Sequence, residues 1–511
     1  MPVLTMIDLL QIQQYIASSN KLKEIVGGSK LVSWATSKSS KSGLISELGE
    51  LGAVKNMIYG AGGNILLKFN DLDEAKKFSS KFCRALYESA PGLECVICHK
   101  KFSNNDFVKT FLNLQKEINE LKTCRKPSLP LLGISVTAIC RSTGKPAYKF
   151  DSEDRAISRE IDLKNKKAEG VYDNYDNIEP CRISLRSGKE IECRHPLDID
   201  HLGRTRGETS LVGIVHIDGN QIGKKIYNWL IENKNSPEIE QKLKEISKQL
   251  DDITKEAFKA VEERVCNACD EDENGRICIF NVDKEKFELQ RENNIYYLPL
   301  RKIFVSGDDI TFICDGRIAF DLAETVLKYL EKERIPHLGK ITASAGIAIV
   351  HSHAPFYRAF ELAYELCKSA KEITRENEKS ALDWQIGLPR KSLKEIRKII
   401  YQTSNGNKLT MRPYPLENEQ NPPIHSWYYL TRKLLIEHLK QWPRSKAKHL
   451  AQIVREGEEE VRETLQNWKI TAPEIKLPEE IAEDGYWGEE TPIIDAIELL
   501  DIYWQLKKEG K

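Results

Sequence analysis

The chain has 511 residues, and its 77 Lys and Arg balance its 77 Asp and Glu. The length exceeds what a single hydrophobic core fills, so we expect about three or four domains. A hydrophobic share of 40% and a charged share of 30% describe an ordinary globular protein, and zero net charge gives no argument for a partner, so a nucleic-acid role would need a local patch.

The sequence shows no targeting or membrane-spanning segment. Its longest apolar runs, such as residues 346–350, are far shorter than a bilayer span. The N-terminus has neither a basic leader nor a small-residue cleavage site. We therefore expect a cytoplasmic protein without a membrane partner, in which the twelve cysteines are reduced thiols rather than a disulfide framework.

The first hundred residues alternate strand and helix patterns in the order β-α-α-β-β-α-β. A glycine turn in the stretch GAGGN predicts a hairpin. Residues 103–122 predict one more helix, and 125–208, rich in Pro, Gly, Arg and Asp, predict an irregular connector. The predicted strands are 4–10, the two arms of 56–69, and 93–100, and the predicted helices are 12–25, 29–36 and 69–90.

A similar order begins again near residue 209, and the pattern after about residue 395 is helical. The repetition indicates an internal duplication. Pro299 cannot donate to a ladder and belongs near a strand start or edge. The predicted strands of this half are 209–218, 295–305, 309–316, 341–352 and 380–386, and the predicted helices are 220–234, 236–266, 318–333 and 354–376.

The long helix 236–266 has a clear predicted start, because Ser236 can cap it and Pro237 fits its first turn. One apolar stripe follows at spacings of four and three, and we expect it to pack within its own domain; a partner helix is the alternative. The stripe consists of Ile239, Leu243, Ile246, Leu250 and Ile253.

Three carboxylates stand out in the second half. Asp218 ends the first predicted strand, and Asp308 and Asp309 lie in the turn of the hairpin VSGDDITF. In a β-α-α-β-β order these strands are neighbours, so the three carboxylates converge and repel unless cations neutralise them. Two Mg²⁺ or Mn²⁺ ions held by such oxygens are the recurrent machinery of phosphoryl and nucleotidyl transfer. The alternative is a solvated, inert turn.

The residues after Asp218 fit a phosphate-binding role. The stretch DGNQIGKK places Gly219 and Gly223 at a helix entry, where small residues let backbone amides approach phosphate oxygens. Lys371, on a later helix, is a candidate phosphate contact, with a solvated lysine as the alternative. His216 alternates with Asp218, and we interpret it as a packed or surface histidine rather than a catalytic one.

Two Cys-x2-Cys pairs raise the question of a structural Zn²⁺ site. Cys95 and Cys98 fall in a predicted strand, which points them to opposite faces. Cys266 and Cys269 close a helix and enter an acidic loop, with Cys278 as a candidate third ligand. We favour packed thiols over zinc in both places.

Together, the stretches IDLLQIQQYIASSNKLKEIVGGSKLV, VGIVHIDGNQIG, FVSGDDITF and SAGIAIVHSHAPFYRAFELAYELCKSAK resemble the palm-domain large subunit of type III CRISPR effector complexes. The resemblance covers about residues 1–100 and 205–390, and more weakly the helical tail with its LTMRPY entry. It implies an α+β fold with two ferredoxin-like palm domains, related to GGDEF and class III cyclases, that joins ATP into cyclic oligoadenylates with two metal ions.

The resemblance also assigns site residues. The catalytic and metal-binding positions fall on Asp218, Asp308 and Asp309, with Ile217 beside Asp218 in the metal-binding set. Gly307 matches the second glycine of the family's GGDD hairpin, and Ser306 replaces the first. The phosphate-holding lysine falls on Lys371. The full expected nucleotide-binding set is Gly219, Asn220, Gln221, Gly223, Ser306, Gly307 and Lys371.

The resemblance has departures. In the N-terminal half Asp8 corresponds to Asp218, but Asn64 stands where a carboxylate is expected, so this palm is expected to be inactive and structural. No His-Asp pair with the context of the family's HD nuclease is found, so we expect a shortened member without it. At the family's zinc site Cys140 is present, but Thr143 replaces the second thiol.

We therefore predict an enzyme, a nucleotidyltransferase that makes cyclic or linear oligonucleotides from ATP or other NTPs in antiviral defence. One alternative is a weakly active nucleotide- and RNA-binding scaffold of a CRISPR-type complex, with RNA or defence subunits as partners. The other is a GGDEF-like homodimeric cyclase. The predicted domains are a degenerate palm at 1–124, a connector with a degenerate zinc ribbon at 125–208, an active palm at 209–392 and a helical domain at 393–511.

Overall fold

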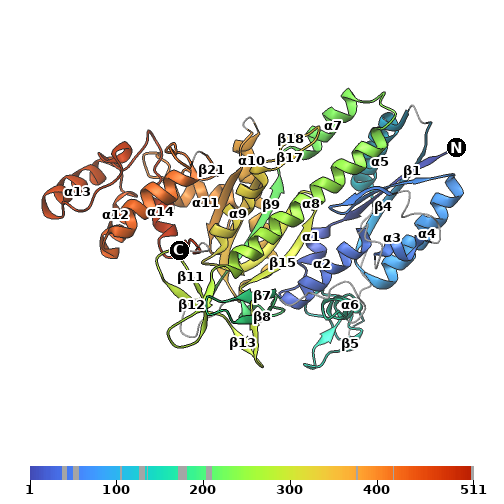
Figure 1. Ribbon diagram of the computed structural model, residues 1–511, viewed down its shortest axis with the longest axis horizontal. Helices are drawn as coiled ribbons and strands as arrows, with labels where there is room; N and C mark the ends of the chain where they lie inside the picture. The colour runs from blue at the N-terminus through green and yellow to red at the C-terminus, as the bar shows by residue number, and fades with distance from the viewer. Residues whose placement is uncertain are drawn as a thin grey trace.

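The computed structural model describes residues 1–36, 43–49, 57–103, 106–125, 133–134, 136–170, 181–202, 210–375, 378–417 and 419–507. Two sheets with their helices and a C-terminal group of helices follow one another along the long axis (Figure 1). The predicted boundary between residues 208 and 209 lies outside the described residues. Within the described ranges, no helix is long and apolar enough to cross a membrane.

The N-terminal part is built on a four-stranded antiparallel sheet, in the order β2-β3-β1-β4. Alternate residues of its central strand pack on opposite sides: Ile7 joins the core under α2 and α4, and Met6 joins the core shared with α5. The strands are β1 (Val3–Leu10), β2 (Met57–Ala61), β3 (Asn64–Phe69) and β4 (Glu94–Lys101), and the helices are α1 (Ile12–Ile16), α2 (Leu22–Thr36), α3 (Leu44–Glu47), α4 (Leu72–Ser89) and α5 (Phe107–Cys124).

The second part repeats this plan in a six-stranded sheet of order β15-β16-β9-β19-β20-β21. Helix α10 packs on one face of β9 and β19, and α8 and α9 lie with the apolar core of the other face. The strands are β9 (Leu211–Gly219), β15 (Leu300–Ser306), β16 (Asp309–Asp315), β19 (Ala343–His351), β20 (Ala381–Ile386) and β21 (Tyr414–Pro415), and the helices are α7 (Ile222–Glu232), α8 (Ile239–Cys266), α9 (Ala319–Lys332) and α10 (Phe356–Thr374).

The predicted α+β class and the repeated strand-helix order are thus confirmed. In both sheets the hairpin pairs with the first strand, whose other edge pairs with the fourth strand. The turn after the first strand is the same in both copies. Gln11 and Gln221 each follow the strand's aspartate by three residues, and both have left-handed backbone angles, with φ of 51° and 56°. This shared turn supports an internal duplication beyond the sheet order alone.

The two sheets pack together because a helix from each part contacts the hairpin of the other part. Helix α2 of the first part contacts β15 of the second, and α8 of the second contacts β2 of the first. The Lys68 ammonium on β3 binds the Glu240 carboxylate on α8 at 2.7 Å. Each half therefore supports the hairpin of the other, as in a two-fold interface.

The start of α8 differs from the prediction. The helix begins at Ile239 after Glu238, and no side chain caps it. Instead, the backbone carbonyl of Ser236 accepts a hydrogen bond from the Ile239 amide at 3.3 Å, so Ser236 and Pro237 form a turn before the helix. The apolar stripe is buried as predicted except for the half-buried Ile253, but α8 packs on β2 of the other palm as well as within its own.

The connector is more regular than predicted. Helix α6 (Arg159–Ala168) packs on α2, and its start is capped by Ser158, whose hydroxyl accepts a hydrogen bond from the Ile161 amide. Its composition is so polar that no apolar period shows in the sequence, which is why the helix was missed. The other connector elements are β5 (Lys149–Phe150), β6 (Ala156–Ile157), β7 (Cys181–Ser184), β8 (Glu190–Arg194) and the 3-10 turn η3 (Ile199–His201).

Small sheets extend the second palm at its base. Strand β8 of the connector pairs in parallel with β14, so connector and palm share a sheet. The strands are β10 (Cys269–Glu271), β11 (Ile277–Phe280), β12 (Lys286–Glu288), β13 (Arg291–Glu292), β14 (Ile295–Tyr297), β17 (Arg334–Ile335) and β18 (Gly339–Lys340).

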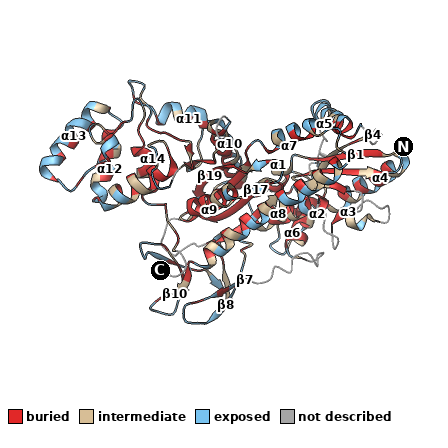
Figure 2. Cartoon of the chain, turned by 45° about the horizontal axis from the view of Figure 1, so that its top comes forward, coloured by how far each residue is buried: buried red, intermediate tan, exposed pale blue. Residues whose placement is uncertain are grey.

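The C-terminal part is helical, as predicted, and lies beyond the second palm (Figure 1). Its buried apolar residues belong to the same core as those of the second palm, and Figure 2 shows buried segments in both parts. Phe320 on α9, for example, stacks on Trp427 with ring centres 5.9 Å apart. The elements are α11 (Leu393–Ile400), the π-helix η4 (Tyr429–His438), η5 (Leu439–Gln441), α12 (Arg444–Ile453), α13 (Glu458–Thr471), η6 (Glu479–Ile481) and α14 (Ile493–Leu499).

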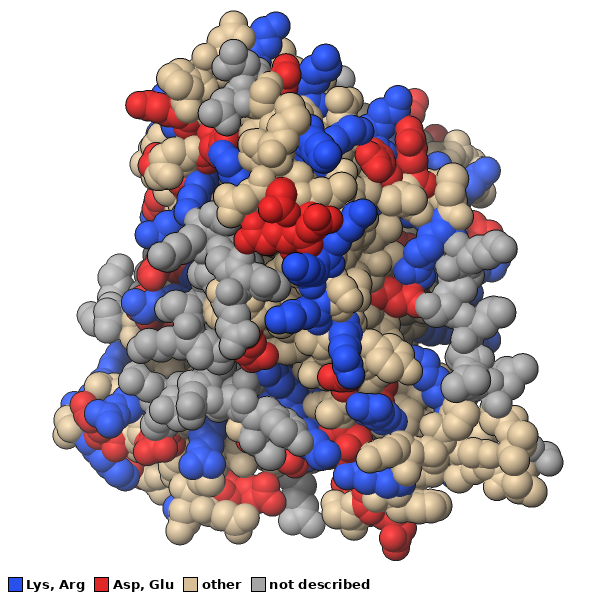
Figure 3. Space-filling view, turned by 90° about the vertical axis from the view of Figure 1, so that its right-hand side faces the viewer, with Lys and Arg blue, Asp and Glu red and all other residues tan. Residues whose placement is uncertain are grey.

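Charge is mixed over the face at the N-terminal end of the molecule. Lys and Arg side chains alternate there with Asp and Glu side chains (Figure 3).

Candidate active site

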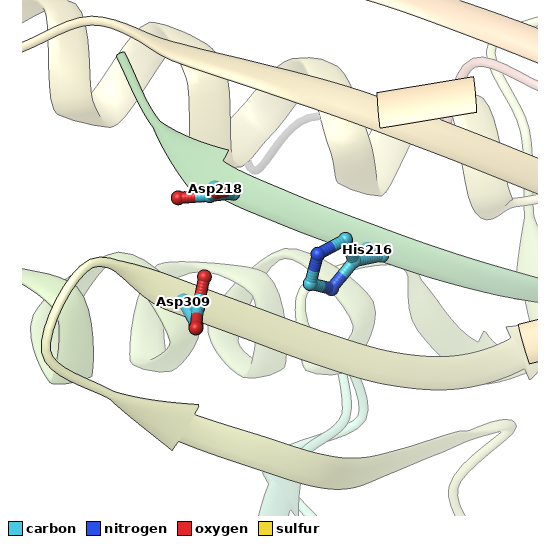
Figure 4. A group of neighbouring side chains, drawn as sticks. All are labelled: His216, Asp218 and Asp309. Atoms are coloured by element: carbon cyan, nitrogen blue, oxygen red, sulfur yellow. The ribbon is translucent and has the colours of Figure 1, made fainter. Parts of the chain in front are cut away.

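Two carboxylates meet across neighbouring strands of the second sheet. Asp218 on β9 and Asp309 on β16 are direct partners in the antiparallel ladder, so their side chains share one face. His216, two residues before Asp218, lies on the same face, and the ligand atoms of the three side chains all lie within 4.8 Å of one another (Figure 4). Among the residues that the structure describes, this is the one group of three metal-binding side chains so closely spaced.

The hairpin turn brings Asp308 to the same place. Gly307 and Asp308 link β15 to β16, and Gly307 has a φ of 66°, which favours glycine. The carbonyl of Asp308 accepts a hydrogen bond from the Gly219 amide at 3.2 Å. A Cβ on Gly219 would stand 2.9 Å from the Cβ of Asp308. Gly219 is therefore needed for the close approach of the turn to the end of β9.

Lys371 is not a freely solvated lysine. Its ammonium, in the last turn of α10, donates hydrogen bonds to the Asp218 carboxylate and, at 3.0 Å, to the Gly219 carbonyl. Burial tends to lower the pKa of Lys371, but the charge of Asp218 outweighs it and the pKa is raised. A charged lysine is thus fixed beside Asp218, and its contact with phosphate stays a prediction.

The carboxylates lie close together, and the pKa values of two of them are raised. Burial raises the pKa of Asp308 to about 6, Asp218 adds to the rise, and Lys371 opposes it. Burial also raises the pKa of Asp309 well above its usual range, helped by the charges of Asp308 and Asp218. Such a set holds protons near neutral pH that a divalent cation would displace.

The donor set fits a divalent cation. Carboxylate oxygens are the ligands that Mg²⁺ and Mn²⁺ prefer. The Nδ1 atom of His216 lies 2.9 Å from the Thr311 hydroxyl, while its buried Nε2 has no hydrogen-bond partner. Burial lowers the pKa of His216 to about 4, so the ring is neutral at pH 7 and able to ligate. Ile217, also predicted in the metal-binding set, can contribute only its backbone carbonyl, because its aliphatic side chain has no ligand atom.

The remaining predicted nucleotide-binding residues surround this point. The buried amide of Asn220 bonds within the protein, to the Thr342 hydroxyl, the Ser344 hydroxyl and the Lys379 carbonyl. Gln221 donates to the Arg375 carbonyl at 2.8 Å. These two side chains fix the turn after β9 against β19 and α10. Gly223 lies in the first turn of α7 with open space around it.

Two residues that hold the turn were missed at the sequence level. On α8, the Thr254 hydroxyl donates to the Gly307 carbonyl at 2.6 Å, and the Asp251 carboxylate accepts from the Gly307 amide at 3.4 Å. Thr254 is buried four residues after Leu250, where the apolar stripe of α8 would continue. A polar residue inside an apolar stripe was the available signal.

The first palm repeats the site with fewer carboxylates. Asp8 pairs with Asn64 across β1 and β3, as Asp218 pairs with Asp309. Lys122, in the last turn of α5, binds Asp8 as Lys371 binds Asp218. The turn AGGN therefore corresponds to SGDD, and the lysine–aspartate pair, which the sequence comparison of the halves did not reveal, is common to both.

The two turns also touch each other. The Gly62 amide in the first hairpin donates to the Ser306 hydroxyl in the second at 3.1 Å. Ser306, the residue that departs from the GGDD pattern, thus makes a contact between the palms that glycine could not make.

Two cavities, of about 610 and 700 Å³, lie elsewhere and are not lined by the three carboxylates.

Comparisons with known proteins agree with this architecture. Residues 211–380 match the family model described as Cas10/Cmr2, second palm domain. No curated protein matches the chain. Similar solved structures are an apo Csm1-Csm4 cassette and the cassette in complex with one ATP, both with a TM-score of 0.55 and 15% identity, and the cassette in complex with cA3, with 0.54 and 14%. They cover 98–99% of this chain, which spans 70% of theirs.

At this identity the solved structures establish the fold. Sheet order, the reciprocal palm contact and the acidic hairpin define a protein with two palm domains. The family match assigns residues 211–380 to the second palm domain of the Cas10/Cmr2 family, and the chain as a whole is similar in fold to the cassette structures.

Proposed function

We propose that this protein is a two-metal nucleotidyltransferase that joins ATP, or other NTPs, into cyclic or linear oligonucleotide messengers, in antiviral defence. The observation that carries the proposal is the meeting of Asp218 and Asp309 across neighbouring strands, with Asp308 in the adjoining turn and Lys371 bound to Asp218. The structures similar in fold were solved with one ATP and with cA3, which supports nucleotides of this class as ligands.

The cations would be held by five groups: the carboxylates of Asp218, Asp308 and Asp309, the His216 imidazole and the Ile217 carbonyl. Two Mg²⁺ or Mn²⁺ ions at this place supply the polarisation of a 3′-hydroxyl and the neutralisation of a triphosphate that phosphodiester formation requires. The protein's own contribution is position. Lys371 places a positive charge beside Asp218, and Thr254 and Asp251 fix the turn that carries Asp308. Pyrophosphate is the leaving group as the 3′-oxygen of one nucleotide attacks the α-phosphate of another.

The first palm would contribute shape rather than chemistry. Asp8 and the neutral Asn64 supply one carboxylate where the second palm supplies three. The Gly62 amide donates a hydrogen bond to Ser306 in the other hairpin, so nucleotides held between the palms would contact both hairpins. We also propose a partner subunit, because the similar structures are cassettes of two different proteins.

The test is incubation of the purified chain with labelled ATP or GTP and Mg²⁺ or Mn²⁺, with product masses and pyrophosphate release as readouts. Asp308→Ala and Asp309→Ala are expected to lower pyrophosphate release at least 100-fold. Asp283→Asn, which changes an exposed aspartate in another turn, is the matched control and is expected to keep full activity.

Each possible result supports a different function for this protein. A single-nucleotide cyclic product would indicate a GGDEF-like cyclase. Nucleotide binding that needs Asp308 but gives no turnover would indicate a scaffold. Equal turnover in the wild type and both alanine variants would reject the site itself.

A further inference from the structure

Four cysteines from distant parts of the chain gather at the C-terminal end of α8. Cys181 on β7 and Cys193 on β8 are direct cross-strand partners, so their side chains share a face. Cys266 ends α8, and Cys269 begins β10 three residues later. The Sγ atom of Cys181 lies 3.1 Å from that of Cys266, which joins the hairpin pair to the Cys-x2-Cys pair.

The cluster is shielded from water. Cys193 and Cys269 are buried, while Cys181 and Cys266 are half-buried. Thiolates gathered away from water need a cation to balance their charge.

We propose that Cys181, Cys193, Cys266 and Cys269 bind one Zn²⁺ as a structural tetrathiolate site. Four thiolates are the ligand number of a closed zinc site, which has Zn–S bonds of about 2.3 Å and hence S–S edges of about 3.8 Å. The 3.1 Å between Cys181 and Cys266 lies between such an edge and a disulfide bond of about 2.05 Å. No three of the four sulfurs lie within 4.8 Å of one another in this structure, so zinc binding at this place requires rotation of the outer side chains toward the Cys181–Cys266 pair.

The site keeps the Cys266 and Cys269 pair considered on sequence, where packed thiols were favoured, but takes Cys181 and Cys193 in place of Cys278. Cys278 faces the other side of the small sheet, since the direct partner of Cys269 is Ile279. Cys95 and Cys98 lie in different cores, on opposite faces of β4, as predicted. Cys140 lies in a small core and interacts with Thr143 and Ser158 rather than with other thiols.

The site would join the connector to the two elements that hold the acidic hairpin. Cys193 is the parallel-ladder partner of Tyr296, just before β15 enters the hairpin. Helix α8, which ends at Cys266, carries the residues that hold the turn. At the same junction His195 bridges both elements, with Nδ1 3.0 Å from the Leu300 carbonyl and Nε2 3.0 Å from the Glu262 carboxylate. The zinc site is thus a structural clamp, and it does not depend on the proposed function.

The test measures metal in the full chain, purified under reducing conditions without chelator. One zinc per chain is expected to remain after gel filtration and to be released by a mercurial thiol reagent. Replacement of zinc by Co²⁺ in the wild-type chain is expected to give the intense visible bands of a tetrahedral thiolate site. This readout needs no mutation, so it holds even where a variant fails to fold.

Cysteine identity is tested by alkylation and mutation. The four cysteines are expected to resist alkylation until the metal is removed, whereas Cys83 and Cys124, both exposed, react throughout. Cys193→Ser with Cys269→Ser is expected to lose the zinc, and Cys95→Ser, the matched control, to keep it. The proposal is overturned by a zinc-free wild type without cobalt bands, by zinc that survives the double change, by iron and sulfide in its place, or by a Cys181–Cys266 disulfide in the reduced protein.

Discussion

At the scale of residues, the two palms differ in one short turn. Ala61-Gly62-Gly63-Asn64 and Ser306-Gly307-Asp308-Asp309 occupy the same place, and the second position has a φ near 60° in both, 60° for Gly62 and 66° for Gly307. The lysine–aspartate pair behind the turn is present in both. The number of carboxylates in the turn, rather than the fold around it, therefore separates the proposed catalytic palm from the structural one.

The raised pKa of Asp308 makes stability depend on pH. Because its pKa of about 6 in the folded chain exceeds the value of about 3.9 in an unfolded one, its contribution is full below about pH 4 and is lost as the pH rises to about 6. Asp308→Asn is therefore expected to be more stable than the wild type at pH 7 by up to about 3 kcal/mol, measured by denaturant unfolding with EDTA. The two curves should meet near pH 4.

Divalent cations should reverse this difference. Mg²⁺ at pH 7 is expected to stabilise the wild type more than Asp308→Asn, because the ion binds the ionised carboxylates of the folded state. Asp283→Asn, with an exposed side chain, serves as the control and should follow the wild type at every pH. A pH-independent gap between wild type and Asp308→Asn would contradict the proposed crowding of carboxylates.

Part of the site could be predicted from the sequence. Asp218, Asp308 and Asp309 stand out because carboxylates at strand ends interrupt apolar runs, and strand order then makes them neighbours. Thr254 and Lys122 could not be placed in the same way, since their roles depend on which turn of a helix faces which hairpin. Asn220 and Gln221 lie in the turn after β9, but their side chains bond to the protein itself, and their nucleotide-binding role stays a prediction.

At the scale of elements, α8 supports the acidic hairpin. Thr254→Val removes the hydrogen bond to Gly307 and leaves that carbonyl unpaired, at a cost of about 1 kcal/mol of stability. We expect turnover to fall about tenfold, with a weaker apparent affinity for Mg²⁺, and Thr254→Ser to restore both. Thr431→Val, at another buried threonine whose hydroxyl bonds within its own helix, is the control. Equal loss of activity in both valine variants would show a general effect of stability instead.

Close packing of α10 on β19 depends on one glycine. A Cβ on Gly346 would lie 2.0 Å from the Ala363 carbonyl oxygen and 2.3 Å from the Cys367 amide nitrogen. Gly346→Ala is expected to cost about 2–3 kcal/mol in denaturant unfolding, because the helix that carries Lys371 must move away. Gly223→Ala, in a helix with open space around it, is expected to raise the free energy of unfolding by about 0.5–1 kcal/mol. A neutral Gly346→Ala would mean that the helix packs less closely than described.

At the scale of the whole molecule, a buried ion network joins the C-terminal helices to the second palm. The Arg412 guanidinium is fully buried and lies 3.0 Å from the Asp495 carboxylate and 3.2 Å from the Glu498 carboxylate. It also donates to the Trp384 carbonyl on β20 at 2.9 Å. The helical part is thus continuous with the palm in its polar contacts as well as in its apolar core.

Breaking that network is expected to destabilise both parts, which should still unfold in one transition. Arg412→Met leaves two carboxylates without their partner and is expected to cost about 3–5 kcal/mol, seen as a lower midpoint of a single unfolding transition. Arg444→Met, whose ion pair with Asp501 is exposed, is the control and should cost less than about 1 kcal/mol. Two separate transitions in the Arg412 variant would show that the helical part is an independent unit.

The sequence by itself determined the local elements, the repeated strand-helix order and the acidic hairpin, because apolar periodicity, turn residues and charge placement are properties of short stretches of chain. It did not determine the start of α8, the helix in the connector or the partners of the polar side chains around the hairpin. The tertiary structure decided the reciprocal contact of the palms, the Lys122–Asp8 pair and the gathering of four cysteines at the end of α8. Those depend on distances between residues far apart in the chain, which only the packing of complete elements fixes.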